Sequence, residues 1–188
     1  MTDREKQFLL YALLITGGIV MWNRRSVSGA ISNATSTVKA VTNTAVAITL
    51  QGAGENEKKY APIIADAEKK YGIPAGMLHR LIKAESAFRS DVISGAKKSG
   101  VGALGIAQFM PSTAKDEGIN PLDPIASIYG AARYLKKVYG WVGNDWTRAV
   151  AGYNWGAGNV NSAAKKYGAN WLTNAPLETK NYVGKIVV

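Results

Sequence analysis

The sequence predicts a mainly α-helical protein, and three observations point to that class. Apolar residues recur at steps of three and four along residues 74–89, which is the spacing of one helix face. Glycine, proline, asparagine and aspartate divide the later part of the chain into segments of helical length. No run of alternating β-branched residues demands a sheet after residue 55. With 188 residues, the chain has room for one ordinary domain and a tail.

The individual helices of this domain are bounded by local signals. Gly72-Ile73-Pro74 is expected to end one helix and to begin the next, with the proline in the first turn. Further helices are expected near residues 111–117, 123–139, 145–154, 158–167 and 176–186.

Composition excludes several kinds of site. The chain is 47% hydrophobic and 19% charged, which fits a folded core. It has no cysteine and one histidine, so a disulfide framework, a thiolate nucleophile and a multi-histidine zinc site are ruled out. The net charge of +10 favours an anionic partner, and nucleic acid, anionic lipid and an acidic cell-wall polymer all qualify.

The first segment, residues 1–25, is predicted to be an N-terminal membrane anchor or apolar helix. Residues 8–22 contain no charge, although a helix of that length is short for a hydrocarbon core of about 30 Å. Trp22 and the following Arg24-Arg25 suit one membrane interface. A cleaved signal peptide, with residues 28–30 at the cleavage site, and a helix buried in an assembly are the alternatives.

Residues 26–54 form a spacer rich in Ser, Thr, Ala, Val and Asn, with Lys39 as the only charge. Residues 41–50 are apolar enough that an assembly segment is the alternative. The folded domain is predicted over residues 55–188. Eighteen basic and ten acidic residues follow Glu55, so residues 56–188 carry a net charge of +8.

Position 85 breaks the apolar stripe of the helix over residues 74–89. The stripe consists of Leu78, Leu81, Ile82, position 85 and Phe88, and position 85 is a glutamate. Burial on this stripe should raise the pKa of Glu85. A carboxylic acid that stays protonated near neutral pH can protonate the leaving oxygen of a glycosidic bond. The alternative is a solvated carboxylate at the helix end.

Two later segments carry polar groups beside glycines. Gly100, Gly102 and Gly105 match G-x-G-x-x-G, but no strand precedes them, so a dinucleotide site is not expected. The glycines instead suit a loop whose backbone closely approaches another chain or a sugar, with the Gln108 amide available to a polar ligand. Tyr153, followed by an asparagine, suits a saccharide, and a hydrogen-bonded core tyrosine is the alternative.

Four motifs occur in order: Glu85-Ser86-Ala87-Phe88, then residues 105–111 (GIAQFMP), 151–156 (AGYNWG) and 178–183 (ETKNYV). Together they resemble the lytic transglycosylase family with the soluble-transglycosylase (SLT) catalytic domain, over about residues 58–188. The resemblance implies a lysozyme-like helical catalytic domain. It also implies cleavage of the β-1,4 bond between N-acetylmuramic acid (MurNAc) and N-acetylglucosamine (GlcNAc) in peptidoglycan. Glu85 would be the sole catalytic acid and base, leaving a 1,6-anhydro-MurNAc end.

The resemblance further implies substrate-binding residues and no cofactor or metal. These residues are Ser99, Gln108, Met110, Tyr153, Asn154 and Tyr182. Two departures from the family pattern stand out. The family's Gly-Leu-Met-Gln is replaced by GIAQ at residues 105–108. The segment between Phe88 and Ser99 is several residues longer than in the family and contains Lys97-Lys98. The longer segment leaves Ser94 as an alternative to Ser99.

Two ionisable residues near Glu85 are given no catalytic role. His79 lies off the apolar stripe and is expected to be a solvated surface histidine. Asp91 is the next acidic residue after Glu85, and it is interpreted as a loop or capping residue.

The resulting hypothesis is a membrane-associated enzyme of the periplasm and cell wall that opens a local gap for phage entry or for a secretion apparatus. Its partners would be peptidoglycan glycan strands, the membrane through residues 8–22, and a homo- or hetero-oligomeric virion or secretion assembly, with nucleic acid secondary. One alternative is a structural membrane or DNA-conduit protein with an accessory or inactive lysozyme-like domain. Another is a hydrolase that uses water.

Overall fold

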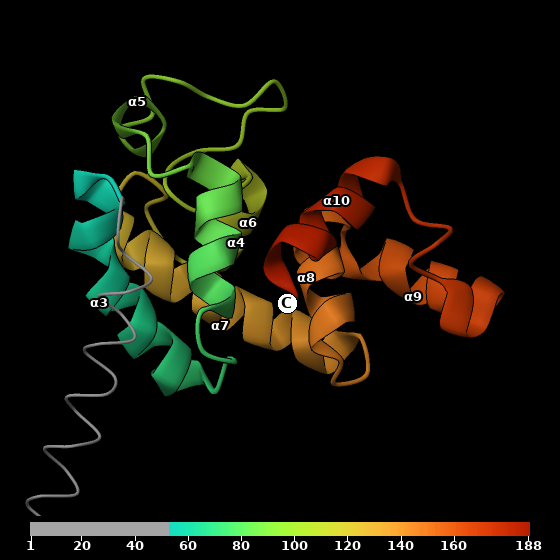
Figure 1. Ribbon diagram of the computed structural model, residues 1–188. Coiled ribbons are helices and arrows are strands. Elements are labelled where there is room, and N and C mark those ends of the chain that lie inside the picture. Colours follow the sequence, from blue (N-terminus) through green and yellow to red (C-terminus); the bar gives the residue numbers. More distant parts are fainter. Residues whose placement is uncertain (1–52) are drawn as a thin grey trace, which may run out of the picture. The chain divides into compact units, whose positions relative to one another are not determined.

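The structure, a computed structural model, describes residues 53–188. This part of the chain consists of helices joined by loops (Figure 1). Within this range the only β pairing is an isolated antiparallel bridge between Leu104 and Phe109, so the mainly α prediction is confirmed there. The helices are α3 (Glu55–Tyr71), α4 (Met77–Ser86), α5 (Ser90–Ile93), α6 (Pro111–Asp116), α7 (Pro124–Trp141), α8 (Trp146–Trp155), α9 (Ala157–Tyr167), the 3-10 turn η1 (Gly168–Asn170) and α10 (Leu177–Ile186).

The predicted anchor at residues 8–22 and nearly all of the predicted spacer lie outside the described residues. Between residues 53 and 188, no helix combines the length and the apolar character needed to cross a membrane.

Side-chain caps mark the starts of two of the five later helices, α7 and α8, near their predicted positions. The Asp123 carboxylate accepts hydrogen bonds from the backbone N–H groups of Ile125 and Ala126 at the start of α7. The Asp145 carboxylate accepts one from Arg148 N at the start of α8. These bonds satisfy N–H groups that have no partner inside the helix. The caps are local, and a sequence pattern can therefore locate them.

The start of α4 differs from the prediction. Gly72 ends α3 in the left-handed conformation, with φ of 64°, as expected of a glycine after a helix. However, α4 begins at Met77 rather than at Pro74, because Pro74 lies in a separate turn in which Met77 N donates to the Pro74 carbonyl at 3.1 Å. Pro74 therefore does not occupy the first turn of α4, and that prediction was wrong.

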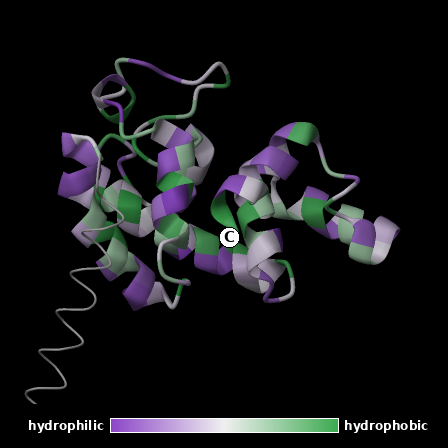
Figure 2. Ribbon diagram, viewed as in Figure 1, coloured by the Kyte–Doolittle hydropathy of each residue, from purple (hydrophilic) through white to green (hydrophobic). Residues whose placement is uncertain are grey.

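The hydrophobic core surrounds α4 and α7. Leu78, Leu81 and Ile82 of α4 are fully buried, as are Ile128 and Leu135 of α7. Figure 2 shows hydrophobic and hydrophilic residues alternating along the helices, as expected when one face of each is turned inward. Helix α3 packs on α4 and α7, while α10 packs on α4 and α8. The last helix of the domain is therefore held directly against α4.

The loop between α5 and α6 contains a glycine that tolerates no side chain. Gly105 has φ of 75°, and a Cβ atom added there would lie 1.8 Å from the backbone oxygen of Pro121. The close approach expected of this loop is thus to another segment of the same chain. Gly102 also has positive φ, 85°, but an added Cβ atom would meet no atom within 4 Å.

Candidate active site

Glu85 lies in the last turn of α4, on the face that buries Leu78, Leu81 and Ile82. Its side chain is half-buried, and its Oε1 atom accepts a hydrogen bond of 2.5 Å from the Tyr182 hydroxyl on α10. The pKa of Glu85 is raised from 4.5 to about 7 as the net result of three causes: burial raises it, the hydrogen bond from Tyr182 lowers it, and the nearby Glu178 charge raises it. The higher pKa expected of a carboxylate on the apolar stripe is confirmed.

Two tyrosines stand beside this carboxyl group. Burial and the Glu85 charge together raise the pKa of both Tyr182 and Tyr153 well above 10, so both phenols are protonated at neutral pH. Tyr153, from α8, donates from its hydroxyl to the Ala107 carbonyl at 2.9 Å. The second, third and fourth sequence motifs are thereby brought to Glu85, which belongs to the first.

Asn154 is engaged by α10. The Thr179 hydroxyl donates to Asn154 Oδ1 at 2.9 Å, and Asn154 Nδ2 donates to Glu178 Oε1 at 3.3 Å. Sequence reasoning gave Glu178 no role. The sequence spacing could have indicated that Glu178 lies near the site, because Glu178 is four residues before Tyr182 on α10 and therefore lies on the same helix face.

Gln108 and Met110 lie in the loop segment that precedes α6. Gln108 has φ of 49°, which is uncommon for a residue with a side chain, and its Nε2 atom donates to the Gly105 carbonyl at 2.9 Å. Leu104 and Phe109 exchange two backbone hydrogen bonds of 3.0 Å around it. Met110 is 40% exposed just before α6, so its thioether is accessible to a ligand.

Ser99 is not joined to the Glu85 cluster by any hydrogen bond in the part of the chain that the structure describes. Its hydroxyl oxygen accepts a bond from Ala103 N at 2.8 Å within its own loop. The alternative, Ser94, is exposed, and its oxygen accepts from Ala96 N at 3.4 Å. Both serines therefore stabilise turns.

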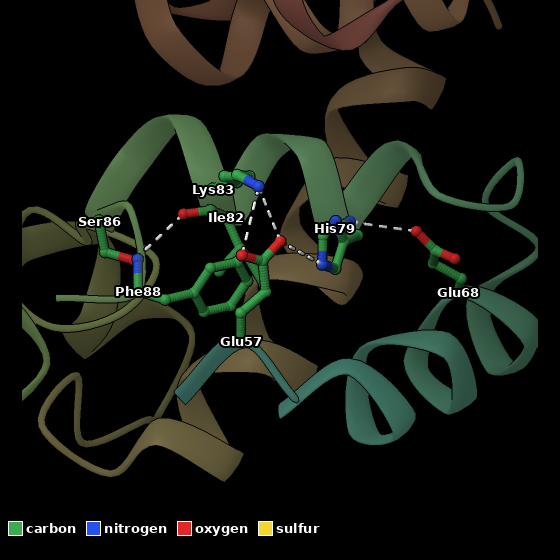
Figure 3. A network of polar contacts seen from close by, with 7 residues as sticks. All are labelled: Glu57, Glu68, His79, Ile82, Lys83, Ser86 and Phe88. Carbon is green, nitrogen blue, oxygen red and sulfur yellow. Dashed lines mark hydrogen bonds and ion pairs between the residues drawn. The ribbon is translucent and has the colours of Figure 1, made fainter. Parts of the chain in front are cut away.

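Behind α4, a polar network attaches the helix to α3 (Figure 3). Lys83 Nζ donates to both carboxylate oxygens of Glu57, at 2.9 and 3.2 Å, and His79 Nε2 lies 3.3 Å from the same group. The His79 ring packs on Phe88 at 5.4 Å between centroids, and its backbone N–H donates to Glu68. This network fixes the side of α4 that does not face the core.

The prediction that His79 is a solvated surface residue was wrong. Its side chain is only 13% exposed, because α3 covers the face of α4 that lies beside the apolar stripe. Burial lowers the pKa of His79, the Glu57 charge opposes this, and nearby Lys83 and Arg80 lower it further. The imidazole is therefore neutral at pH 7.

The chain leaves α4 through an unusual turn. Ala87 and Phe88 are both left-handed, with φ of 48° and 55°, a conformation that costs free energy in residues with a side chain. Phe88 N donates to the Ser86 hydroxyl oxygen at 3.3 Å, and Asn56 Nδ2 donates to the Phe88 carbonyl at 2.9 Å. Beyond the turn, Asp91 lies in α5 and pairs with Arg89, which fits a local structural role.

Among residues 53–188, no three or more His, Asp or Glu side chains are grouped to hold a metal ion. The half-buried Glu85 lies beside two tyrosines that are protonated at neutral pH. A carboxyl group with a pKa of about 7 can both donate and accept a proton near neutral pH.

The helical fold and this carboxyl site belong to the lysozyme-like class of proteins. Residues 62–173 match the family model described as "Transglycosylase SLT domain", and the chain belongs to that family. The resemblance to this family is thereby confirmed, and the matched range includes the first three motifs but ends before the fourth, residues 178–183.

Three relatives illustrate the similarity. The chain is 33% identical over 137 residues to "Membrane-bound lytic murein transglycosylase D" of Escherichia coli strain K12, covering 66% of this chain and 29% of that protein. It is 31% identical over 125 residues to "Transglycosylase" of Enterobacteria phage PRD1, covering 66% and 40%. An inactive mutant of the lytic transglycosylase Slt from Pseudomonas aeruginosa superposes with a TM-score of 0.56 at 28% identity, covering 66% and 22%. The chain thus spans less than half the length of each.

Proposed function

We propose that this protein is a peptidoglycan lytic transglycosylase that cleaves the MurNAc-β-1,4-GlcNAc bond and leaves a 1,6-anhydro-MurNAc end. The observation that carries the proposal is Glu85, half-buried with a pKa of about 7 and hydrogen-bonded by Tyr182. Membership of the SLT family and the names of the three relatives support the same activity.

In the proposed reaction, the protonated Glu85 gives its proton to the glycosidic oxygen, and the bond from that oxygen to the anomeric carbon of MurNAc breaks. The Glu85 carboxylate then takes the proton of the MurNAc 6-hydroxyl as this oxygen attacks the anomeric carbon. The new C–O bond closes the 1,6-anhydro ring, and Glu85 is protonated again. No water is consumed, and no metal or cofactor is required.

Tyr182 orients the carboxyl group in this scheme. Its hydroxyl occupies Oε1, which leaves Oε2 for the substrate, and its hydrogen bond stabilises the ionised form between the two proton transfers. A second carboxylate is not needed as a nucleophile, because the attacking hydroxyl belongs to the substrate. We assign substrate binding to Ser99, Gln108, Met110, Tyr153, Asn154 and Tyr182.

We further propose that the activity opens a local gap in the cell wall during phage entry or for a secretion apparatus. One relative is a phage transglycosylase, which supports the role in phage entry, and another is described as membrane-bound, which supports an association with a membrane. In this arrangement residues 1–25 anchor the protein in a membrane, residues 26–54 are the spacer, and residues 55–188 reach the wall.

Digestion of purified peptidoglycan by the full chain tests the activity, with the products identified by mass spectrometry. Wild type should release anhydro-muropeptides, and Glu85→Gln should release none. Glu55→Gln is the matched control, because Glu55 is fully exposed on α3 and should be dispensable. Reducing muramic ends would indicate hydrolysis by water. No product from folded wild type would contradict the proposal and favour the DNA-conduit alternative.

A further inference from the structure

Four aromatic side chains that contact one another, Trp141, Tyr134, Tyr153 and Phe109, form an aromatic row, and Trp141 is its exposed end. Trp141 is the last residue of α7, and 55% of its surface is accessible. The neighbouring Gly140 and Gly143 are exposed and have no side chain to cover the indole. Asn161 Nδ2 donates to the Trp141 carbonyl at 3.0 Å, which fixes the backbone beneath the ring. Tryptophan is enriched at binding interfaces, because its ring combines a large apolar surface with a polar N–H group.

Ring contacts connect Trp141 to the candidate active site. Its ring lies 6.2 Å from that of Tyr134, at an interplanar angle of 78°, and Tyr134 lies 5.5 Å from Tyr153 at 69°. Phe109 completes the cluster, at 6.2 Å from Tyr134 and 6.3 Å from Tyr153. Three of these pairs are edge-to-face and the Phe109–Tyr153 pair is tilted at 59°, and such contacts are favourable and hold each ring in one orientation. The row is therefore continuous and rigid.

The inner end of the row lies at Glu85. Asn154, the residue after Tyr153, accepts a hydrogen bond from Thr179 on α10 at 2.9 Å, and the same helix carries Tyr182, which donates to Glu85. The Glu85 charge also contributes to the raised pKa of Tyr153. Tyr134 and Trp141 are seven residues apart on α7, a spacing that puts both on one helix face. The row thus leads from the carboxyl group along α7 to solvent.

We propose that Trp141 is an outer sugar-binding platform, on which the glycan strand packs at a distance from the bond cleaved at Glu85. This inference rests on the proposed function. A pyranose ring has an apolar face of C–H groups that packs on an indole, while its hydroxyl groups stay in water. A single ring beside two glycines is too small for a protein interface but fits one sugar of a long polymer. The strand is also the ligand that would extend along the row from Glu85.

If Trp141 binds a sugar, the affinity of the protein for oligosaccharides should depend on their length. A sugar on Trp141 is remote from the reacting atoms and binds equally in the ground state and the transition state, so it lowers KM without raising kcat. Short oligosaccharides placed at Glu85 would not reach Trp141, and their affinity should not depend on it.

The test uses the full chain carrying Glu85→Gln, which binds without turnover, and peptide-free GlcNAc–MurNAc oligosaccharides of increasing length in calorimetry. Trp141→Ala should weaken binding of the longest oligosaccharide about tenfold and leave that of the disaccharide unchanged. Trp141→Phe should restore most of the loss, because a ring is retained. Ile125→Ala is the matched control, since Ile125 is 51% exposed on the same helix and should have no effect.

Three results would overturn the inference. Equal affinity of the Trp141→Ala and parent proteins at every length would show that the indole contacts no sugar. An equal loss at every length, or failure of Trp141→Phe to restore binding, would indicate a structural role. If the parent protein binds no oligosaccharide of any length, the proposed function itself is contradicted. This result differs from one in which the parent binds but Trp141→Ala has no effect, which contradicts only the role of Trp141.

Discussion

Asn56 on α3 donates from its side-chain amide to the Phe88 carbonyl at 2.9 Å, across 32 residues of sequence. The same Nδ2 atom lies 2.9 Å from the Ser90 hydroxyl oxygen. The two bonds hold the C-terminal end of the left-handed turn, Ala87 and Phe88, that follows α4 just after Glu85. Asn56 therefore offsets part of the conformational cost of that turn, and it fixes where the chain leaves the helix that carries the carboxyl group.

Asn56→Ala should lower the free energy of unfolding by about 1–2 kcal/mol, because the Phe88 carbonyl loses its partner. It should also lower kcat, since the position of Glu85 becomes less well defined. Denaturant unfolding and peptidoglycan digestion measure the two effects. Asn174→Ala is the control, because its amide bonds only to the Asn170 carbonyl on the surface. Equal stability of the two variants would contradict the role given to Asn56.

Glu85→Gln should stabilise the protein at alkaline pH. The pKa of Glu85 is about 7 in the folded protein against 4.5 for the free group, so between these values the folded state binds the extra proton and its stability falls as pH rises. The amide cannot ionise. The stability advantage of the variant should be absent below pH 4.5 and reach up to about 3 kcal/mol above pH 7. Thermal unfolding at pH 4 and pH 8 checks this, and a pH-independent difference would contradict it.

Tyr182→Phe should shift the pH dependence of kcat/KM. The Tyr182 hydrogen bond favours ionised Glu85 and lowers its pKa, so removing the hydroxyl should raise that pKa. The alkaline limb, where the acid loses its proton, should move to higher pH, and the maximal rate should fall as the carboxyl group loses its orientation. Tyr167→Phe, at an exposed tyrosine on α9, should leave the profile unchanged. An unshifted limb in Tyr182→Phe would exclude the bond as a determinant of acidity.

Gly105→Ala should be far more damaging than Gly102→Ala. Both glycines have positive φ, so each substitution bears the conformational cost of about 1 kcal/mol. Only at Gly105 would the new methyl group also collide with the Pro121 backbone, at 1.8 Å. We expect Gly105→Ala to lose several kcal/mol or to fail to fold, whereas Gly102→Ala loses about 1 kcal/mol. Comparable stability of the two variants would show that the Pro121 contact is unimportant.

The helices were predictable because their signals are local. The aspartates at positions 123 and 145 cap α7 and α8 through bonds to residues two or three positions away. Glu85 was predictable for a related reason, since a single helix period places it among buried leucines. The four motifs added the tyrosines that surround it.

Features that depend on distant segments were not predictable in this way. His79 is covered by α3, and no property of α4 alone indicates which neighbour lies on its flank. Gly105 is required by Pro121, sixteen positions later, and Glu178 becomes relevant only because α10 packs on α4. Each depends on tertiary packing, which helix periodicity and capping rules do not predict.

The distance along the chain between Glu85 and Tyr182, 97 residues, has a consequence for biosynthesis. Glu85, the proposed proton donor, is synthesised before Tyr182, whose hydroxyl arrives only with α10. A nascent chain that has emerged through α8 therefore presents Glu85 without Tyr182, and its carboxyl group is neither enclosed nor oriented. Such non-local contacts form late in folding because closing the intervening loop costs entropy. The proposed catalytic centre would thus be completed only once α10 has been synthesised.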